Sequence, residues 1–245
     1  MGIPRTGLLA ATLTIAAAAA LIESRVDARA GGTSTSGAGQ SAGGGSIRGR
    51  VGTPGAAPSG ALKVTVDEKI CGSSVPNEEV AADSAGGIAY AVITVKGLAW
   101  TGAPVTPRVT NKGCRFVPHV SVARPGSTLE ITNEDPTLHT THGYSADKRS
   151  LFNIALPIPG IVVKRPLALG VSRFACDTHP WMRAFVAVTA DRSVVTGADG
   201  SFRVADVPPG SYEVTVWHET LQASSQKVTV AAGQPAELNF TLARR

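Results

Sequence analysis

Helix-forming patterns and aromatic side chains are scarce in this sequence of 245 residues. Aromatic residues make up 5% of it, and there are only 3 cysteines and 2 methionines. Beyond residue 30, no long segment has the Leu, Glu and Lys periodicity of an amphipathic helix, whereas Gly, Val, Thr, Ala and Pro are frequent. Short apolar runs separated by turn residues are typical of strands. The sequence therefore predicts an all-β protein.

Clustered charge is also lacking. The formal net charge is +5, but the Lys and Arg residues form no block. A thinly spread charge indicates a solvated surface rather than a nucleic-acid site. No Ser/His/Asp arrangement and no pair of catalytic carboxylates stands out, so we expect neither nucleic acid as a partner nor an enzyme.

The first thirty residues have the pattern of an export signal. Arg5 precedes an apolar run from Gly7 to Ile22, and Ala28-Arg29-Ala30 offers a cleavage site. The run falls short of the roughly 20 apolar residues that a membrane span needs. We therefore expect cleavage near Ala30, no stable membrane span afterwards, and a bacterial periplasmic or secreted protein. Residues 31–46, rich in Gly and Ser, are predicted to be a flexible linker.

The odd number of cysteines is informative in an oxidising compartment. Cys71 and Cys114 are the natural disulfide pair, which leaves Cys176. Closing a loop of that length stabilises a fold by about 4 kcal/mol in the chain-entropy model. An unprotected third thiol would tend to oxidise, and a bound metal would protect it.

Cys176 opens the stretch CDTHPWM, in which Cys176, His179 and Met182 follow at three-residue spacing. Thiolate, imidazole and thioether ligands suit copper, and a trigonal His₂Cys site with a weak axial Met is the blue-copper pattern. The alternative is a buried Cys and Met in an ordinary loop, beside a surface His.

A second histidine ligand has to come from elsewhere in the chain. His139 and His142 have an odd separation, so in one strand they would point to opposite faces and only one would reach the metal. His139 follows Leu138 near the end of the strand containing Ile131, and it is our predicted ligand, with His142 as the alternative. We interpret His119 and His218 as surface or structural histidines.

Apolar alternation predicts several further segments. Residues 88–95 read as a buried strand, and residues 120–122 and 129–131 as strands joined by a turn. Residues 145–165 are less regular and rich in proline, so we expect a loop there. After residue 190, short strands at regular spacing suggest a small sandwich.

Two segments resemble amicyanin-type cupredoxins. CDTHPWMRAFVAV is similar to their ligand loop, and FVPHVSVARPGSTLEITNEDPTLHTTH to the strands that lead to their first histidine ligand. The likeness covers Ile88 to Thr189. It implies a Greek-key cupredoxin β-sandwich holding one copper ion, with His139, Cys176 and His179 as strong ligands and Met182 as the axial one. The family usually has Asn after the first histidine, and this chain has Thr140.

A second resemblance concerns the two ends of the mature chain. TGADGSFRVADVPPGSYEVTVWHE resembles carboxypeptidase regulatory-like (transthyretin-like) sandwich modules, and SIRGRVGTPGAAPSGALKVTV matches their first two strands. We expect a cupredoxin-like domain with an N-terminal β extension over residues 47–190 and a smaller sandwich over 191–245. In the alternative, residues 47–66 complete that smaller sandwich. The combination is similar to periplasmic methylamine-utilisation-type proteins.

These resemblances imply an electron carrier. The expected function is transfer of single electrons between redox partners such as a dehydrogenase or a cytochrome, with Pro180 and Trp181 as an apolar docking patch or, for Trp181, core packing. Multicopper oxidases and copper nitrite reductases need further ligands, usually His-x-His pairs, and the sequence has none. The alternatives are copper carriage or delivery, and a cell-envelope binding module whose metal site is structural or lost.

Overall fold

The computed structural model describes residue 2, residues 43–55 and residues 60–245. The predicted signal segment and most of the predicted linker therefore lie outside the described residues. Strand β1 (Gly45–Gly52) includes the last two residues of that predicted linker. Within the described part of the chain, no helix is long and apolar enough to cross a membrane. The predicted all-β fold class is confirmed.

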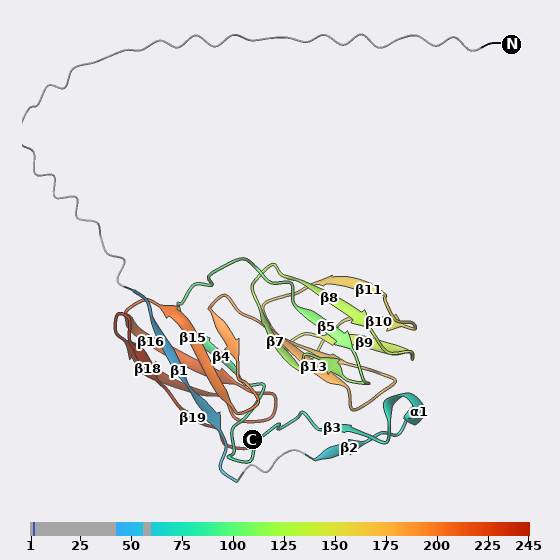
Figure 1. Ribbon diagram of the computed structural model, residues 1–245, viewed down its shortest axis with the longest axis horizontal. Coiled ribbons are helices and arrows are strands. Elements are labelled where there is room, and N and C mark those ends of the chain that lie inside the picture. The colour runs from blue at the N-terminus through green and yellow to red at the C-terminus, as the bar shows by residue number, and fades with distance from the viewer. Residues whose placement is uncertain (1, 3–42, 56–59) are drawn as a thin grey trace, which may run out of the picture. The chain divides into compact units, whose positions relative to one another are not determined.

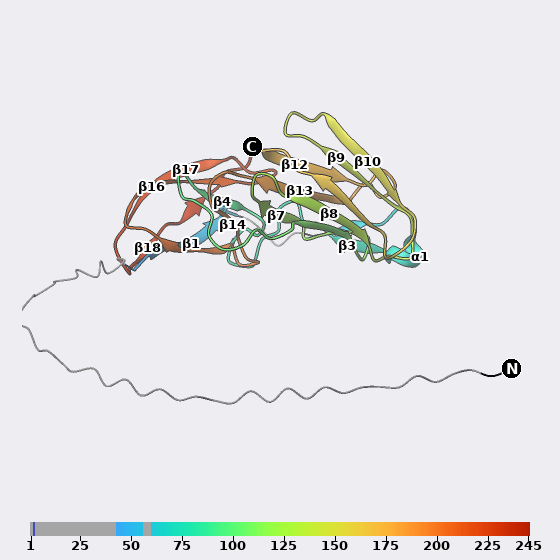
Figure 2. The same ribbon diagram turned by 90° about the horizontal axis from the view of Figure 1, so that it is seen from above.

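One β-sandwich, which we call sandwich A, is built from two sheets (Figures 1 and 2). The first has the order β10-β9-β12-β13-β7 and consists of β7 (Val120–Ala123), β9 (His139–Tyr144), β10 (Ser150–Leu156), β12 (Gly170–Ala175) and β13 (Arg183–Val188). The second has the order β11-β8-β5-β6 and consists of β5 (Arg108–Asn111), β6 (Phe116–Val117), β8 (Thr128–Asn133) and β11 (Val162–Pro166).

The core of sandwich A follows from the alternation along its strands. In β8, every second side chain is buried, and Leu129 and Ile131 are fully enclosed. They pack with Phe174 and Val186 of the facing sheet in one apolar cluster. Burying such side chains stabilises a fold by roughly 1.5–3 kcal/mol each. Cys176 and Met182 belong to the same cluster, so the ligand loop is joined to this core.

A second β-sandwich, sandwich B, is also built from two sheets. One has the order β14-β4-β16-β17 and consists of β4 (Val92–Val95), β14 (Ser193–Val195), β16 (Gly210–Trp217) and β17 (Ser224–Val230). The other has the order β15-β1-β18, with β15 (Ser201–Val207), β18 (Pro235–Glu237) and, paired with β1, β19 (Phe240–Thr241). Its core includes Ile47, Ile93, Phe202 and Val214, contributed by both sheets.

Sandwich B contains strands from distant parts of the chain. β1 pairs antiparallel with β15 and parallel with β18 and β19. β4 pairs with β14 and β16, although the expected cupredoxin-like range starts at Ile88. Sandwich A therefore lies, in sequence, between β4 and β14.

Residues 145–165, for which we expected a loop, contain β10 and the first part of β11. β10 is an edge strand paired with β9, and β11 is an edge strand paired with β8. Proline is compatible with edge strands and with turns. Pro157 and Pro159 lie in the turn between the two strands and Pro166 at the end of β11, so the loop prediction was wrong for a physical reason.

A further segment, residues 61–76, which we call the arm, belongs to neither sandwich. β2 (Ala61–Lys63) pairs with β3 (Ser74–Pro76), and in the described part of the chain neither strand joins another sheet. Between them lies α1 (Glu68–Cys71), a single turn with no buried residue. Figure 1 shows α1 at the far end of the arm from the strand pair.

Candidate metal centre

The structure brings together three of the predicted ligands. His139 is the first residue of β9, Cys176 directly follows β12, and His179 lies in the loop before β13. β9 and β12 are hydrogen-bonded neighbours, which places the start of one beside the end of the other. Both imidazoles are fully buried and the Cys176 thiol is 3% exposed. One donor atom from each residue lies within 4.8 Å of the other two.

The donor atoms form a triangle that fits one metal ion. His139 Nδ1 lies 3.0 Å from His179 Nδ1, and Cys176 Sγ lies 4.0 and 3.6 Å from these two nitrogens. A point equidistant from the corners of a triangle with these sides lies about 2.1 Å from each. Metal–imidazole and metal–thiolate bonds in proteins are roughly 2.0–2.3 Å long. The existing side-chain positions therefore fit a trigonal N₂S centre.

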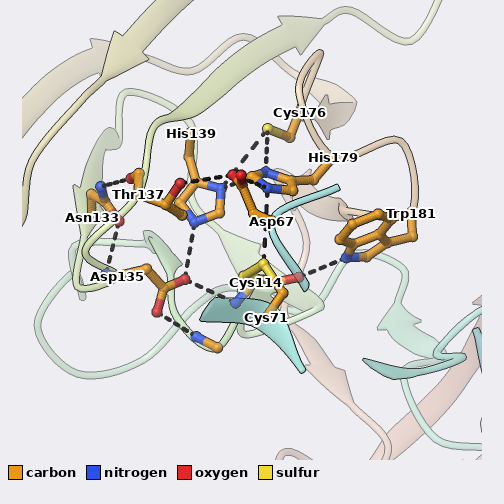
Figure 3. The surroundings of a disulfide bond; sticks show 11 residues. Asp67, Cys71, Cys114, Asn133, Asp135, Thr137, His139, Cys176, His179 and Trp181 are labelled. Atoms are coloured by element: carbon orange, nitrogen blue, oxygen red, sulfur yellow. Dashed lines mark hydrogen bonds and ion pairs between the residues drawn. A yellow bond between two sulfur atoms is a disulfide. The ribbon is translucent and has the colours of Figure 1, made fainter. Parts of the chain in front are cut away.

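The outer nitrogens of both rings are held by carboxylates (Figure 3). His139 Nε2 lies 3.0 Å from Asp135 Oδ2, and His179 Nε2 lies 3.2 Å from Asp67 Oδ2. A neutral imidazole has one N–H, which these acceptors draw to Nε2. The two Nδ1 atoms then face each other with lone pairs, an arrangement that a bound cation satisfies. Carboxylate–histidine pairs of this kind commonly orient metal ligands.

Electrostatics favour the neutral form of the His139 ring. Burial lowers the pKa of His139, so the ring resists taking a second proton. Asp135 also accepts hydrogen bonds from the backbone N–H groups of Gly113 and Cys114, at 2.7 and 2.8 Å. The pKa of Asp67 is lowered, chiefly because the Thr137 hydroxyl donates to its carboxylate at 2.8 Å. The Asp67 carboxylate is thus held in its ionised form by its hydrogen-bond donors, and the Asp135 carboxyl group accepts three hydrogen bonds.

Thr140 connects the two ligand segments. Its hydroxyl accepts a hydrogen bond from the backbone N–H of Asp177 at 2.7 Å. Its own backbone N–H donates to Cys176 Sγ at 3.3 Å. The residue at which this chain departs from the cupredoxin pattern therefore still links β9 to the Cys176 loop, with a hydroxyl in place of an amide.

Met182 and Trp181 complete the loop. The N–H of Met182 donates to the carbonyl of His179 at 2.9 Å, and the Met182 side chain is buried beside Cys176 in the core. Trp181 is half-buried, packs against the same core and donates its indole N–H to the Cys114 carbonyl at 2.9 Å. Of the proposed docking patch, Pro180 is exposed, while Trp181 is largely a packing residue.

His142 is not part of this cluster. Side chains along β9 alternate, with His139 and Thr141 buried on one face and His142 on the other. Its ring bonds to Asp177, Tyr144 and Ser150, at 3.2, 2.9 and 2.9 Å. These contacts fasten the residue after Cys176 to β9 and β10.

His119 and His218 also lie outside the cluster, and both are buried. His119 bonds through Nε2 to Glu219 and through Nδ1 to the Arg183 carbonyl, joining the two sandwiches where Val120 and Phe185 pack with Val92. His218 accepts hydrogen bonds from the backbone N–H groups of Thr220 and Leu221. Their roles are structural.

The predicted Cys71–Cys114 disulfide is confirmed, with the sulfurs 1.96 Å apart, and Cys176 is the free cysteine. Sequence reasoning did not connect this disulfide with the metal site, although Cys71 Sγ lies 3.9 Å from His179 Nε2. It also missed both carboxylates. Asp135 carried a signal, because it lies four residues before His139 in the Asn-x-Asp motif, whereas Asp67 is 112 residues from His179 and carried none.

Comparisons with known proteins give two likenesses. Residues 176–243 match the family model of the carboxypeptidase regulatory-like domain. That match includes β13, which the structure places in sandwich A. No protein of curated function matches the chain by sequence.

Solved structures with a similar fold include a purple cupredoxin from Nitrosopumilus maritimus, at 21% identity over 34% of this chain and 99% of that one, with a TM-score of 0.30. Amicyanin from Paracoccus versutus is 17% identical over 40% of this chain and 97% of its own, with a TM-score of 0.30. Both resemblances expected from the sequence recur here. At this level of similarity, only the geometry of the site itself bears on function.

Proposed function

We propose that this protein is an exported copper-binding electron carrier, with His139, Cys176 and His179 as strong ligands and Met182 as a weak one. One observation carries the proposal: two buried imidazole nitrogens and a buried thiol form a triangle that fits one ion, and each ring is held from behind by a carboxylate. Thiolate and imidazole ligands with a nearby thioether suit copper in both of its common oxidation states.

The chain's own residues would keep this centre still. His139 is fixed by the β9 ladder, Cys176 by hydrogen bonds from Thr140, and His179 by the loop that closes on Met182. Copper bound there would supply reversible one-electron chemistry. A cage that moves little between two oxidation states lowers the reorganisation that electron transfer requires.

Export is part of the same proposal. The Cys71–Cys114 disulfide is of a kind that persists in oxidising compartments, and it agrees with the signal-like residues 1–30. A periplasmic or secreted carrier would exchange electrons with a protein partner such as a dehydrogenase or a cytochrome, and we propose no reaction catalysed by the chain itself.

The test is spectroscopic. Purified protein with its Cys176 thiol reduced is titrated with Cu(II), and we expect an intense visible thiolate-to-copper band at one ion per chain that disappears and returns through reduction and reoxidation. Cys176→Ala should abolish the band, and His142→Ala should leave it intact because His142 lies on the other face of β9. Absence of the band while the Cys176 thiol is free and the protein folded would refute the proposal.

A further inference from the structure

The arm covers the metal site at the edge of His179. Asp67 and Cys71, at the two ends of α1, both contact Nε2 of the His179 ring, at 3.2 and 3.9 Å. The ring is fully buried, although the residues on either side of it in sequence, Thr178 and Pro180, are half-buried and exposed. Figure 3 shows the disulfide on the side of the imidazole away from Cys176, and Asp67 next to the ring.

The tip of the arm, residues 67–71, has few other anchors. α1 buries no residue, and outside the tip itself the Asp67 side chain bonds, among the described residues, to Thr137 as well as to His179. The base of the arm is better attached, because Val64 and Val75 are buried and Glu78, two residues beyond the arm, pairs with Arg115 at 3.1 Å. The Cys71–Cys114 bond is therefore the strongest connection between the tip and sandwich A.

The two cysteines of that bond differ in the exposure of the whole residue. Cys114 is fully buried, whereas Cys71 is partly exposed. Thiol–disulfide exchange requires a thiolate to reach one sulfur in line with the bond. An external dithiol would therefore attack Cys71.

We propose that the arm tip is a disulfide-latched cover of the metal site, which a dithiol reductant opens. The reductant's thiolate forms a bond to Cys71 Sγ, and the Cys71–Cys114 bond breaks, with its electron pair going to Cys114, which takes up a proton. The second thiol of the reductant then displaces Cys71 as a thiol. The reductant loses two electrons and becomes a disulfide, and the protein gains two thiols.

Opening leaves His179 accessible, because its covering contacts with Asp67 and Cys71 depend on the latch. As an extension that rests on the proposed function, the latched form retains copper and the open form exchanges it.

The first experiment needs no copper. Metal-free protein is treated with an imidazole-acylating reagent, and each histidine is followed by peptide mass spectrometry. We expect His179 to be protected in the disulfide form, and to be acylated at least about tenfold faster in Cys71→Ala/Cys114→Ala or after dithiol treatment, a factor equivalent to about 1.4 kcal/mol of opening free energy. Thr137→Val removes the hydrogen bond to Asp67 but leaves the disulfide intact, so it should raise the rate of His179 acylation less.

The chain supplies its own controls. His119 and His218 are buried away from the arm tip and should stay protected in every form, whereas partly exposed His142 should react equally in all of them. Equal protection of His179 with and without the disulfide would overturn the proposal. Exposure of His119 and His218 together with His179 would also overturn it, because the disulfide would then be a staple of the whole fold.

A second experiment follows copper release to a chelator by the loss of the visible band, with and without the disulfide. Faster release from the open form supports the extension to copper exchange, and equal release overturns that extension. The failures are distinguishable. If the protein binds no copper but the disulfide still protects His179 from acylation, the proposed function is refuted and the cover is not. If the protein binds copper but His179 is equally protected with and without the disulfide, the cover is refuted and the proposed function is not.

Discussion

The two histidines of the site, each with the carboxylate that holds it, form two halves that are supported by different parts of the chain. His139 is backed by Asp135, four residues away, within a turn that Asn133 shapes through hydrogen bonds to Thr137 and Leu156. His179 is backed by Asp67, which reaches it from the arm. One half of the site is therefore intrinsic to sandwich A, and the other depends on an added segment. The two halves should differ in how much they tolerate change.

The largest effect is expected at Asp135. In Asp135→Ala, the His139 ring and the Cys114 N–H lose their acceptor in a buried place, and the N–H of exposed Gly113 also loses its partner. Leaving buried donors unpaired costs about 1–3 kcal/mol each, so the free energy of unfolding should fall by about 3 kcal/mol or more. Urea denaturation measures this, and Glu134→Ala, which removes an exposed carboxylate next to Asp135 in sequence, is the control. A fall of less than about 1 kcal/mol in the free energy of unfolding would contradict the idea that the His139 half of the site is built into sandwich A.

His218 provides the contrasting case of a buried histidine whose ring bonds to no carboxylate among the described residues. Burial lowers its pKa from 6.5 to about 4. The unfolded chain then binds a proton at higher pH than the folded one, so stability is fully present above about pH 6.5 and falls as the pH drops towards 4. Two and a half pKa units correspond to about 3 kcal/mol. Denaturation at several pH values measures the fall, and it should be smaller in His218→Gln; an identical fall in both would contradict the assignment.

A smaller effect is expected at Asp67. Asp67→Ala removes the acceptor from His179 Nε2, but the carboxylate is partly exposed, so water replaces it in part. We expect copper affinity to fall by about tenfold, the lower end of the usual range for such partners, and the unfolding free energy to change by about 1 kcal/mol or less. Competitive copper titration against a chelator, with Glu68→Ala as the control, checks this. If Asp67→Ala lowered the free energy of unfolding as much as Asp135→Ala does, the two halves of the site would not differ in the way proposed.

The smallest effect concerns the link between β9 and the ligand loop. Thr140→Val keeps the size of the side chain and the N–H to Cys176 Sγ, but it removes the hydroxyl that accepts from Asp177. We expect a loss of about 1 kcal/mol of stability, with the copper band retained but shifted. Thr140→Asn, which restores a polar side chain, should reverse most of the loss. No shift in either variant would contradict the linking role of Thr140.

The features that depend on local patterns could be predicted from the sequence. The period of two along a strand correctly separated His139 from His142, and cysteine counting found the disulfide. Features that depend on long-range pairing could not. β1 joins β15 through pairs such as Ile47 with Val204. The sequence offered residues 47–66 as part of the smaller sandwich only as an alternative, through a family resemblance, because neither segment by itself specifies its partner strand. Asp67 has no local motif either, because its position beside His179 comes from the arm's attachment at Cys114.

The junction between the sandwiches has a consequence for modularity. β4 and β14 are adjacent antiparallel strands, with Thr94 opposite Ser193 and the Val95 N–H donating to the Arg192 carbonyl at 3.0 Å. Residues 96–191 therefore leave and re-enter sandwich B at neighbouring points. In the topology of sandwich B, β4 and β14 form a β-hairpin, and sandwich A is inserted in the loop of that hairpin. A short turn joining residues 95 and 192 should close the same hairpin, and any sandwich inserted there needs only that its own two ends lie close together.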